Sequence, residues 1–371
     1  MYPEALVNHL ARTHSDHCLV LLCLDAPSGA RLIRLFCFQP MWLSHPTFPD
    51  FVSATWAEDL SLKPNVEKFT RDVISWNKDV FGNIFHKKNR VEARLRGVQA
   101  SIAHRPSEAL FRLENQLQRE FLDILKQEEE FWSVKSRYNW LIQGDRNTKF
   151  FHTSTLIRCK RNRISSLQDN QGNWVHDEQE VAELVRSGFV SLFSSESVYV
   201  PWKPWVIPRW SKGLNLEEAS VLAVVPTSRE VKEGLWSLKP LKAPGLDELH
   251  AGFFQAYWSV VGDNVIKEVK DIFTTLVMPG HLNKTLISLI PKRPRADCLA
   301  AFRPISLCNI VYKIVTKIIV KRMRNLLPNL ISPLQTAFVP GRLGLDNMII
   351  AQEIIHTISG KRGQVGTWPS K

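Results

Sequence analysis

The sequence predicts an α+β protein in which helices dominate and short strands occur in separate places. Between residues 40 and 139, apolar residues recur at three- and four-residue steps, which is typical of helices that bury one face. Apolar runs near the N-terminus, and two extended segments between residues 286 and 307, have the composition of strands instead. Hydrophobic residues make up 44% of the 371 residues, so the chain can bury cores in two or three domains.

The first 38 residues contain two strand-like runs, around Leu6–Leu10 and at Leu19–Leu24, and Pro27–Gly29 marks a turn after the second. Two neighbouring strands are too few to form a stable domain. Residues 1–38 are therefore predicted to be the end of a larger domain.

Residues 39–215 form the helical and basic part of the chain. Pro106 separates two apolar stripes, and Ser107 can cap the second helix, so an antiparallel helical hairpin is predicted. Glu128–Glu130 is predicted to be a solvated face of that helix, and the Ser-, Pro- and Trp-rich residues 195–215 to be an irregular linker. The stripes are Val91, Leu95, Val98 and Ile102, then Leu110, Leu113, Leu117, Phe121 and Ile124.

The formal net charge of +12 favours an acidic partner, such as nucleic acid or an anionic membrane surface. The six cysteines show no C-x-x-C spacing with a histidine partner, so neither a zinc site nor a disulfide framework is indicated. Reduced cysteines indicate a nuclear or cytoplasmic location. No apolar run approaches the ~20 residues of a membrane span, and no signal peptide is recognisable, so no membrane partner is expected.

Aromatic and basic residues alternate between Tyr138 and Arg163. Rings that stack on bases, and cations that pair with phosphates, are what single-stranded nucleic acid requires. The alternative is a loop whose aromatic residues pack on the helical hairpin; spacing alone favours this alternative, and a structural role for His152. The candidate nucleic-acid contacts here are Arg158, Lys160, Arg161 and Arg163.

Two segments, Trp76–Asn83 and Trp140–His152, resemble segments of LINE-type (non-LTR) retrotransposon polyproteins, especially those of plants. Lys242–Asp247 resembles the opening motif of their reverse transcriptases, usually K-A-P-G-P-D-G. Leu246 and Glu248 stand where the family has Pro and Gly, which raises the question of a positive φ at Glu248. A capping box at Thr227 and Glu230 predicts the start of a helix just before this motif.

Two further segments are similar to the family's finger motifs. The first comprises Leu286–Lys292 and Phe302–Leu307, and the resemblance implies that Lys292 and Arg303 bind the phosphates of the incoming nucleotide. The alternative for Arg303 is a buried ion pair with Asp297. The second segment, Gln335–Arg342, implies that Gln335, Phe338 and Arg342 lie near the template base and nucleotide.

Ten cations and a single acid, Asp297, occupy residues 281–331, which predicts a positive surface for a nucleic-acid backbone or a triphosphate. Three lysines recur four residues apart on a helix whose opposite face is apolar; whether they contact template or only water remains open. The candidate nucleic-acid contacts in this segment are Arg293, Arg295, Lys313, Lys317 and Lys321.

Polymerases of this family hold two Mg²⁺ ions with carboxylates from segments like K-L-D-M-S-K-A-Y-D and F-x-D-D, and neither segment is found here. No metal or cofactor is therefore expected for this chain, although Mg²⁺ is expected for the full-length family. Ser15–His17 resembles the closing motif of the endonuclease/exonuclease/phosphatase domain that precedes the polymerase. Asp16 and His17 would be relics of that catalytic site.

The resemblance thus predicts an endonuclease remnant at 1–38, a linker region at 39–215 and a truncated reverse transcriptase at 216–371. The last would be an incomplete right-hand polymerase, with fingers and the start of a palm, that leaves apolar surface exposed. The predicted function is an inactive fragment of an RNA-directed DNA polymerase; the alternative is a non-enzymatic, basic nucleic-acid-binding protein. Either would bind RNA or DNA weakly and without sequence preference, and the oligomeric state is not predicted.

Overall fold

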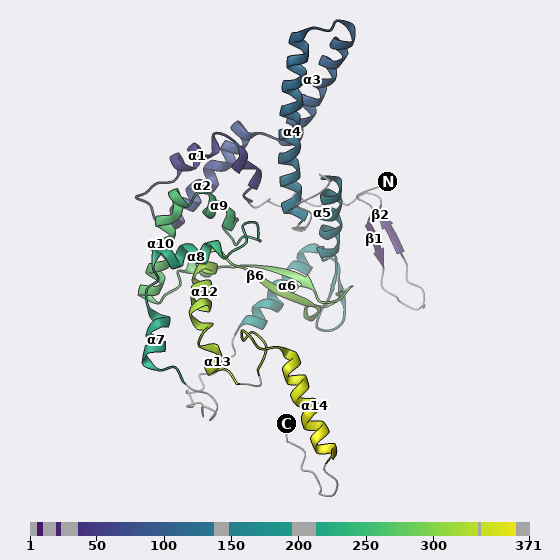
Figure 1. Ribbon diagram of the computed structural model, residues 1–371. Helices are drawn as coiled ribbons and strands as arrows, with labels where there is room; N and C mark the ends of the chain where they lie inside the picture. The colour runs from purple at the N-terminus through teal and green to yellow at the C-terminus, as the bar shows by residue number, and fades with distance from the viewer. Residues whose placement is uncertain are drawn as a thin grey trace. The chain divides into compact units, whose positions relative to one another are not determined.

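The computed structural model describes residues 6–9, 20–23, 36–136, 148–194, 213–294, 296–332 and 335–360 (Figure 1). The chain divides into two units, residues 1–37 and residues 38–371, which are described separately. Among the described helices, none is both long enough and apolar enough to cross a membrane.

The first unit contains an antiparallel strand pair, β1 (Leu6–His9) and β2 (Val20–Cys23). Leu6 is opposite Cys23 and His9 is opposite Val20. The two predicted strands are therefore confirmed. The endonuclease origin of this unit stays a prediction, and Asp16 and His17 lie outside the described residues.

The second unit begins with four short helices that enclose an aromatic core. Phe48 packs on Tyr257 with ring centroids 5.7 Å apart, and Phe69 packs on Phe253 at 4.7 Å. The indole N–H of Trp56 donates to Asn264 Oδ1 at 2.6 Å. The helices are η1 (Pro40–Ser44), α1 (Phe48–Thr55), α2 (Leu62–Trp76) and η2 (Asn77–Phe81), which meet α9 (Ala251–Ala256) and α10 (Trp258–Thr275).

This core joins segments from the two sides of the boundary predicted near residue 215. Buried aromatic side chains dominate such cores because each removes a large apolar area from water and pairs edge to face with its neighbours. The sequence patterns are local, and they gave no indication that residues 38–81 pack against residues 251–275.

The helical hairpin is formed by α3 (Ile84–His104) and α4 (Glu108–Ser136), which lie side by side in Figure 1. The predicted stripes meet in one apolar cluster around Val91, Leu117 and Ile124. Asn83 caps α3 by accepting from the N–H groups of Phe85 and His86, and the hydroxyl of Ser107 accepts from Leu110 N–H. The predicted antiparallel hairpin is confirmed.

The predicted solvated face at Glu128–Glu130 is wrong for Glu128. This residue is buried, and its Oε2 lies 2.6 Å from Nζ of Lys88 on the facing helix. A carboxylate can be buried when a cation of the neighbouring helix balances its charge. Burial also raises the pKa of Glu130 above its usual value. The acidic run looks solvated in the sequence because Lys88 is 40 residues away along the chain.

A mixed region follows, in which a strand hairpin packs on a helix and a short ribbon. Leu167, Val181 and Phe302 form its buried cluster, with Leu289 packed against them. Figure 1 shows α6 passing close to the hairpin of β5 and β6. The elements are α5 (Thr148–Asn162), β3 (Leu167–Gln168), β4 (Trp174–Val175), α6 (Glu178–Phe193), β5 (Leu286–Pro291), η3 (Leu299–Ala301) and β6 (Phe302–Leu307).

Helices α7, α8, α10 and α11 contact α12, whose apolar face is buried as predicted. Thr227 and Glu230 form the predicted capping box at the start of α8. In contrast, α14 exposes its isoleucines, including Ile350, Ile354 and Ile358. The helices are α7 (Leu216–Ala223), α8 (Ser228–Trp236), α11 (Gly280–Asn283), α12 (Ile310–Met323), α13 (Leu327–Leu330) and α14 (Gly344–Gly360).

Candidate nucleic-acid interface

The predicted opening motif forms a tight turn against the start of α12. Glu248 N–H donates to the Gly245 carbonyl at 3.1 Å, and Asn309 Oδ1 accepts from Leu246 N–H at 2.9 Å. A Cβ at Gly245 would lie 2.2 Å from Asn309 Oδ1, so only glycine fits there. The predicted turn on Pro244–Gly245 is confirmed.

Glu248 adopts a positive φ of 54°, at the position where the resembled motif has glycine. An L-residue pays roughly 1–2 kcal/mol for this left-handed conformation. Burial, and then the charge of Asp247, also raise the pKa of the Glu248 carboxyl. The turn is therefore held in place by its neighbours against a local cost.

Asp247 lies beside this turn, with Oδ1 accepting from Leu249 N–H at 3.2 Å. Asp247 is only partly exposed, and burial of its carboxyl raises the pKa to about 6. Lys313 moderates this shift while its Nζ donates to the Ala243 carbonyl at 2.8 Å. Lys313 therefore stabilises the turn.

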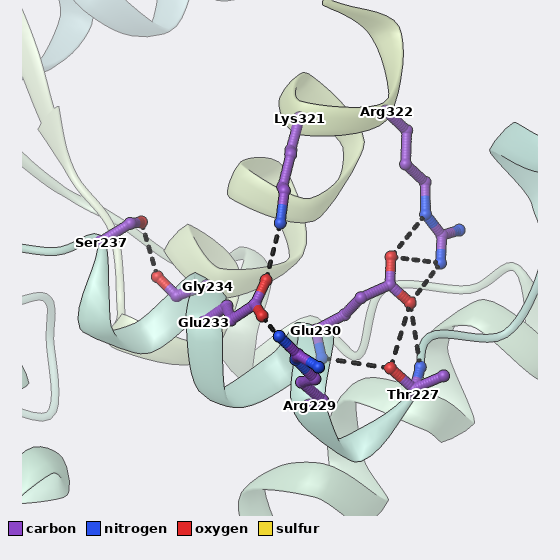
Figure 2. Close-up of polar contacts among 8 residues, drawn as sticks. All are labelled: Thr227, Arg229, Glu230, Glu233, Gly234, Ser237, Lys321 and Arg322. Carbon is purple, nitrogen blue, oxygen red and sulfur yellow. Dashed lines mark hydrogen bonds and ion pairs between the residues drawn. The ribbon is translucent and has the colours of Figure 1, made fainter.

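The other lysines of the predicted row differ in their surroundings. Nζ of Lys321 lies 2.6 Å from Glu233 Oε2, an ion pair drawn in Figure 2. The side chain of the next residue, Arg322, is only 8% exposed and donates to both carboxylate oxygens of Glu230. Lys317 is exposed, and no ion pair involving it is found among the described residues.

The predicted second finger motif is a loop held together by Arg342. This guanidinium donates to the backbone carbonyls of Gln335 at 2.8 Å and Pro328 at 3.1 Å, and also to those of Ser332 and Ile331. Gln335 is exposed, and Phe338 is fully exposed (100%) with a φ of 66°. The loop thus presents Phe338 to solvent and uses Arg342 to keep its shape.

The first finger motif places Lys292 and Arg303 on one face of the β5–β6 hairpin. Arg303 is opposite Ile290 in the antiparallel pairing, and Lys292 follows Ile290 by two residues. Side chains alternate between the two faces of a strand, so both cations lie opposite the face that buries Leu289 and Phe302.

The connection between the two strands contains Arg293, whose guanidinium lies 2.6 Å from Asp297. This hydrogen bond lowers the pKa of the Asp297 carboxyl. The alternative in which Asp297 pairs with Arg303 is wrong, because Arg303 is exposed and Asp297 is paired with Arg293. Lys292 remains exposed at the surface while its Nζ donates to the Ala300 carbonyl at 2.7 Å, and Arg295 lies outside the described residues.

The basic residues of α5 lie beside this hairpin. The helix contacts both α4 and β5, and Ile164, just beyond its end, belongs to the same apolar cluster as Phe302. Arg161 and Arg163 are exposed, whereas Arg158 donates to the Lys135 carbonyl.

Aromatic residues of α5 pack on the helical hairpin of α3 and α4. This agrees with the alternative that residue spacing favoured, in which these side chains have a structural role. Phe151 is buried, and the ring of His152 lies 4.5 Å from that of Trp132. Residues 137–147, which include most of Trp140–His152, lie outside the described residues.

The structure thus brings together two basic segments that are about 130 residues apart in the sequence. We call this region the basic junction. It is defined by the exposed cations at the C-terminal end of α5 and in the β5–β6 hairpin. Cations carried by neighbouring segments raise the local positive potential, which attracts phosphates. Its residues are Lys160, Arg161, Arg163, Lys292, Arg293 and Arg303.

Within the described residues, no group of three or more His, Cys, Asp or Glu side chains could hold a metal ion. The side chains that define the basic junction are cations and hydrogen-bond donors.

The chain is similar to a transposon-encoded protein. It is 29% identical over 226 residues to the Transposon TX1 uncharacterized 149 kDa protein of Xenopus laevis. The match covers 60% of this chain and 17% of that protein, so the chain spans less than a fifth of the length of this relative. No family model matches the chain.

We predict that Glu248→Gly stabilises the protein by about 1 kcal/mol, because glycine adopts a positive φ without a Cβ clash. The free energy of unfolding from urea titration measures the change. Glu248→Ala keeps the Cβ and removes the rest of the side chain, including the charge near Asp247. An equal gain from alanine would contradict the backbone explanation.

We also predict a pH-dependent effect of Asp247→Asn. The folded-state pKa of about 6 is above the unfolded value of 3.8, so the folded protein binds more protons and loses stability as the pH rises through this window. The stability of the variant relative to the wild type should therefore increase from pH 4 to pH 7, as measured by urea unfolding. Asp263→Asn, at an exposed position on α10, is the control; a flat difference for Asp247→Asn would contradict the prediction.

Proposed function

We propose that this chain is the linker and fingers part of a LINE-type retrotransposon reverse transcriptase, and that its basic junction contacts nucleic acid. The convergence of the two basic segments is the observation that carries the proposal. The similarity to a transposon-encoded protein and the order of the resembled motifs support the family. Binding through phosphates would be salt-dependent and tolerant of sequence.

In this proposal, Lys292 and Arg303 retain the phosphate-binding role that the resemblance implies. Both are exposed on one face of the β5–β6 hairpin, where a triphosphate or a nucleic-acid backbone can approach. Arg342, Lys313 and Lys321 have structural partners instead, so we propose that they position the surrounding loops and helices.

The fold that we propose is an incomplete right-hand polymerase with fingers and the edge of a palm. Polymerisation requires carboxylates that hold two Mg²⁺ ions, and the printed sequence contains no match to the family's carboxylate segments. We therefore propose that this chain is inactive by itself. The second candidate, a non-enzymatic nucleic-acid-binding protein derived from a retroelement, shares the basic junction and differs in having no polymerase role in any longer form.

Binding to the basic junction is tested by replacing three of its cations. Arg161→Gln, Arg163→Gln and Lys292→Gln together should weaken binding of a labelled 20-nucleotide single strand about tenfold or more at 0.1 M salt. Each lost phosphate contact should also reduce the slope of log affinity against log salt by roughly 0.7, and fluorescence anisotropy measures both quantities.

A matched control triple variant, Arg90→Gln, Arg94→Gln and Arg105→Gln, changes the net charge equally but alters exposed cations of the helical hairpin. We expect a much smaller effect from this variant. An equal loss in both triple variants would show that only the net charge matters. An affinity that does not respond to salt would overturn the proposal.

Polymerase activity is tested by primer extension on an RNA template with Mg²⁺ and deoxynucleotides. We expect no extension by the purified 371-residue chain. Sustained synthesis would contradict the proposed inactivity, and it would mean that carboxylates other than those of the resembled segments hold the metal ions.

A further inference from the structure

Trp174 is a large aromatic side chain that the structure leaves at the surface of the basic junction. In the β3–β4 ribbon, Leu167 is opposite Val175 and Gln168 is opposite Trp174. Leu167 and Val175 pack into the apolar cluster, so alternation along the strands directs Trp174 away from it. The side chain is 40% exposed, and its ring is nearly parallel to that of His176, with an interplanar angle of 17°.

The ribbon holds this ring in a fixed place. Asp169 Oδ1 accepts from the N–H groups of Gln171 and Asn173, both at 2.8 Å. Asp169 N–H in turn donates to the Asn173 carbonyl at 2.9 Å, and Gly172 adopts a φ of 87° that suits the tight turn. Because the turn is closed by several hydrogen bonds, little conformational freedom is lost when a ligand stacks on Trp174.

Two segments next to the ribbon contain exposed cations. Arg163 precedes Ile164, which packs in the same cluster as Val175, the neighbour of Trp174. Along β3, Gln168 N–H donates to the Asp297 carbonyl at 2.7 Å, and the side chain of Asp297 pairs with Arg293. The ribbon that carries the exposed ring is therefore adjacent to two segments, one containing Arg163 at the end of α5 and the other containing Arg293 in the hairpin connection.

An exposed ring with cations on adjoining segments suits an unpaired base better than a duplex. The ring can stack on the face of a free base while the arginines contact the adjoining phosphates. In a duplex the base faces are already stacked on one another, so the ring finds no free base face on which to stack.

We propose that Trp174, stacked on His176, is a base-stacking platform that makes the basic junction prefer single-stranded nucleic acid. This inference rests on the proposed nucleic-acid binding and adds the class of ligand. Trp174 contributes to base contact and the arginines to phosphate contact, so the two contributions can be separated by experiment.

The test measures the affinity of the full chain for three labelled probes at 0.1 M salt: oligo(dT) of 20 nucleotides, a 20-base-pair duplex, and a 20-nucleotide abasic strand. Trp174→Ala should weaken binding to oligo(dT) about tenfold, as loss of one base–aromatic stack does. Its affinity for the duplex and for the abasic strand should change less than twofold. The salt dependence should stay the same, because no charge is removed.

Two variants control for folding and for general loss of aromatic surface. Trp174→Phe keeps a ring and should restore most of the oligo(dT) affinity. Trp236→Ala removes another exposed tryptophan (47%), which lies in α8 and packs on Trp258 of α10. This variant should leave binding unchanged. Circular dichroism checks that each variant is folded.

The proposal is overturned if Trp174→Ala weakens all three probes equally, if it weakens none, or if Trp236→Ala has the same effect. Failure of the proposed function has a different outcome. In that case the wild-type chain binds none of the probes at low salt, and both proposals are overturned together.

Discussion

The burial of Leu167, Val181 and Phe302 in one cluster is the constraint on which the candidate interface depends. Phe302 begins β6, whereas Leu167 lies in the ribbon that follows α5. Because each side chain must leave water, the strand hairpin and the ribbon are held against each other. The segments that carry the neighbouring cations are thereby held next to each other, although no cation–cation contact favours this arrangement.

The excess of basic residues serves two purposes in this structure. Arg322, Lys321 and Arg342 satisfy carboxylates or backbone carbonyls and connect helices and loops. An arginine that donates to several acceptors at once is well suited to such a role because its donors have a fixed geometry. Other cations, such as Arg163 and Arg303, are exposed. A charge count therefore overstates the surface that is open to a ligand.

The local features of the chain were predictable from the sequence because their causes are local. The stripes of the helical hairpin, the Thr227–Glu230 capping box and the turn at Pro244–Gly245 each depend on residues within a few positions of one another. The possible positive φ at Glu248 was also visible, as a departure from the glycine of a resembled motif. Glu128 was misinterpreted because its partner, Lys88, belongs to the facing helix.

The sequence by itself determined the helical hairpin, the strands of β1–β2 and β5–β6, the basic character and the resemblance to retroelement proteins, but it did not predict the β3–β4 ribbon. Only the tertiary structure decided which cations have partners within the protein and which distant segments lie next to each other. The packing of Phe48 and Phe69 on Tyr257 and Phe253 joined segments that are some 200 residues apart, and the cluster at Phe302 placed α5 next to the strand hairpin. Such contacts arise from the complementary shapes of distant side chains, and periodicity within one segment carries no information about them.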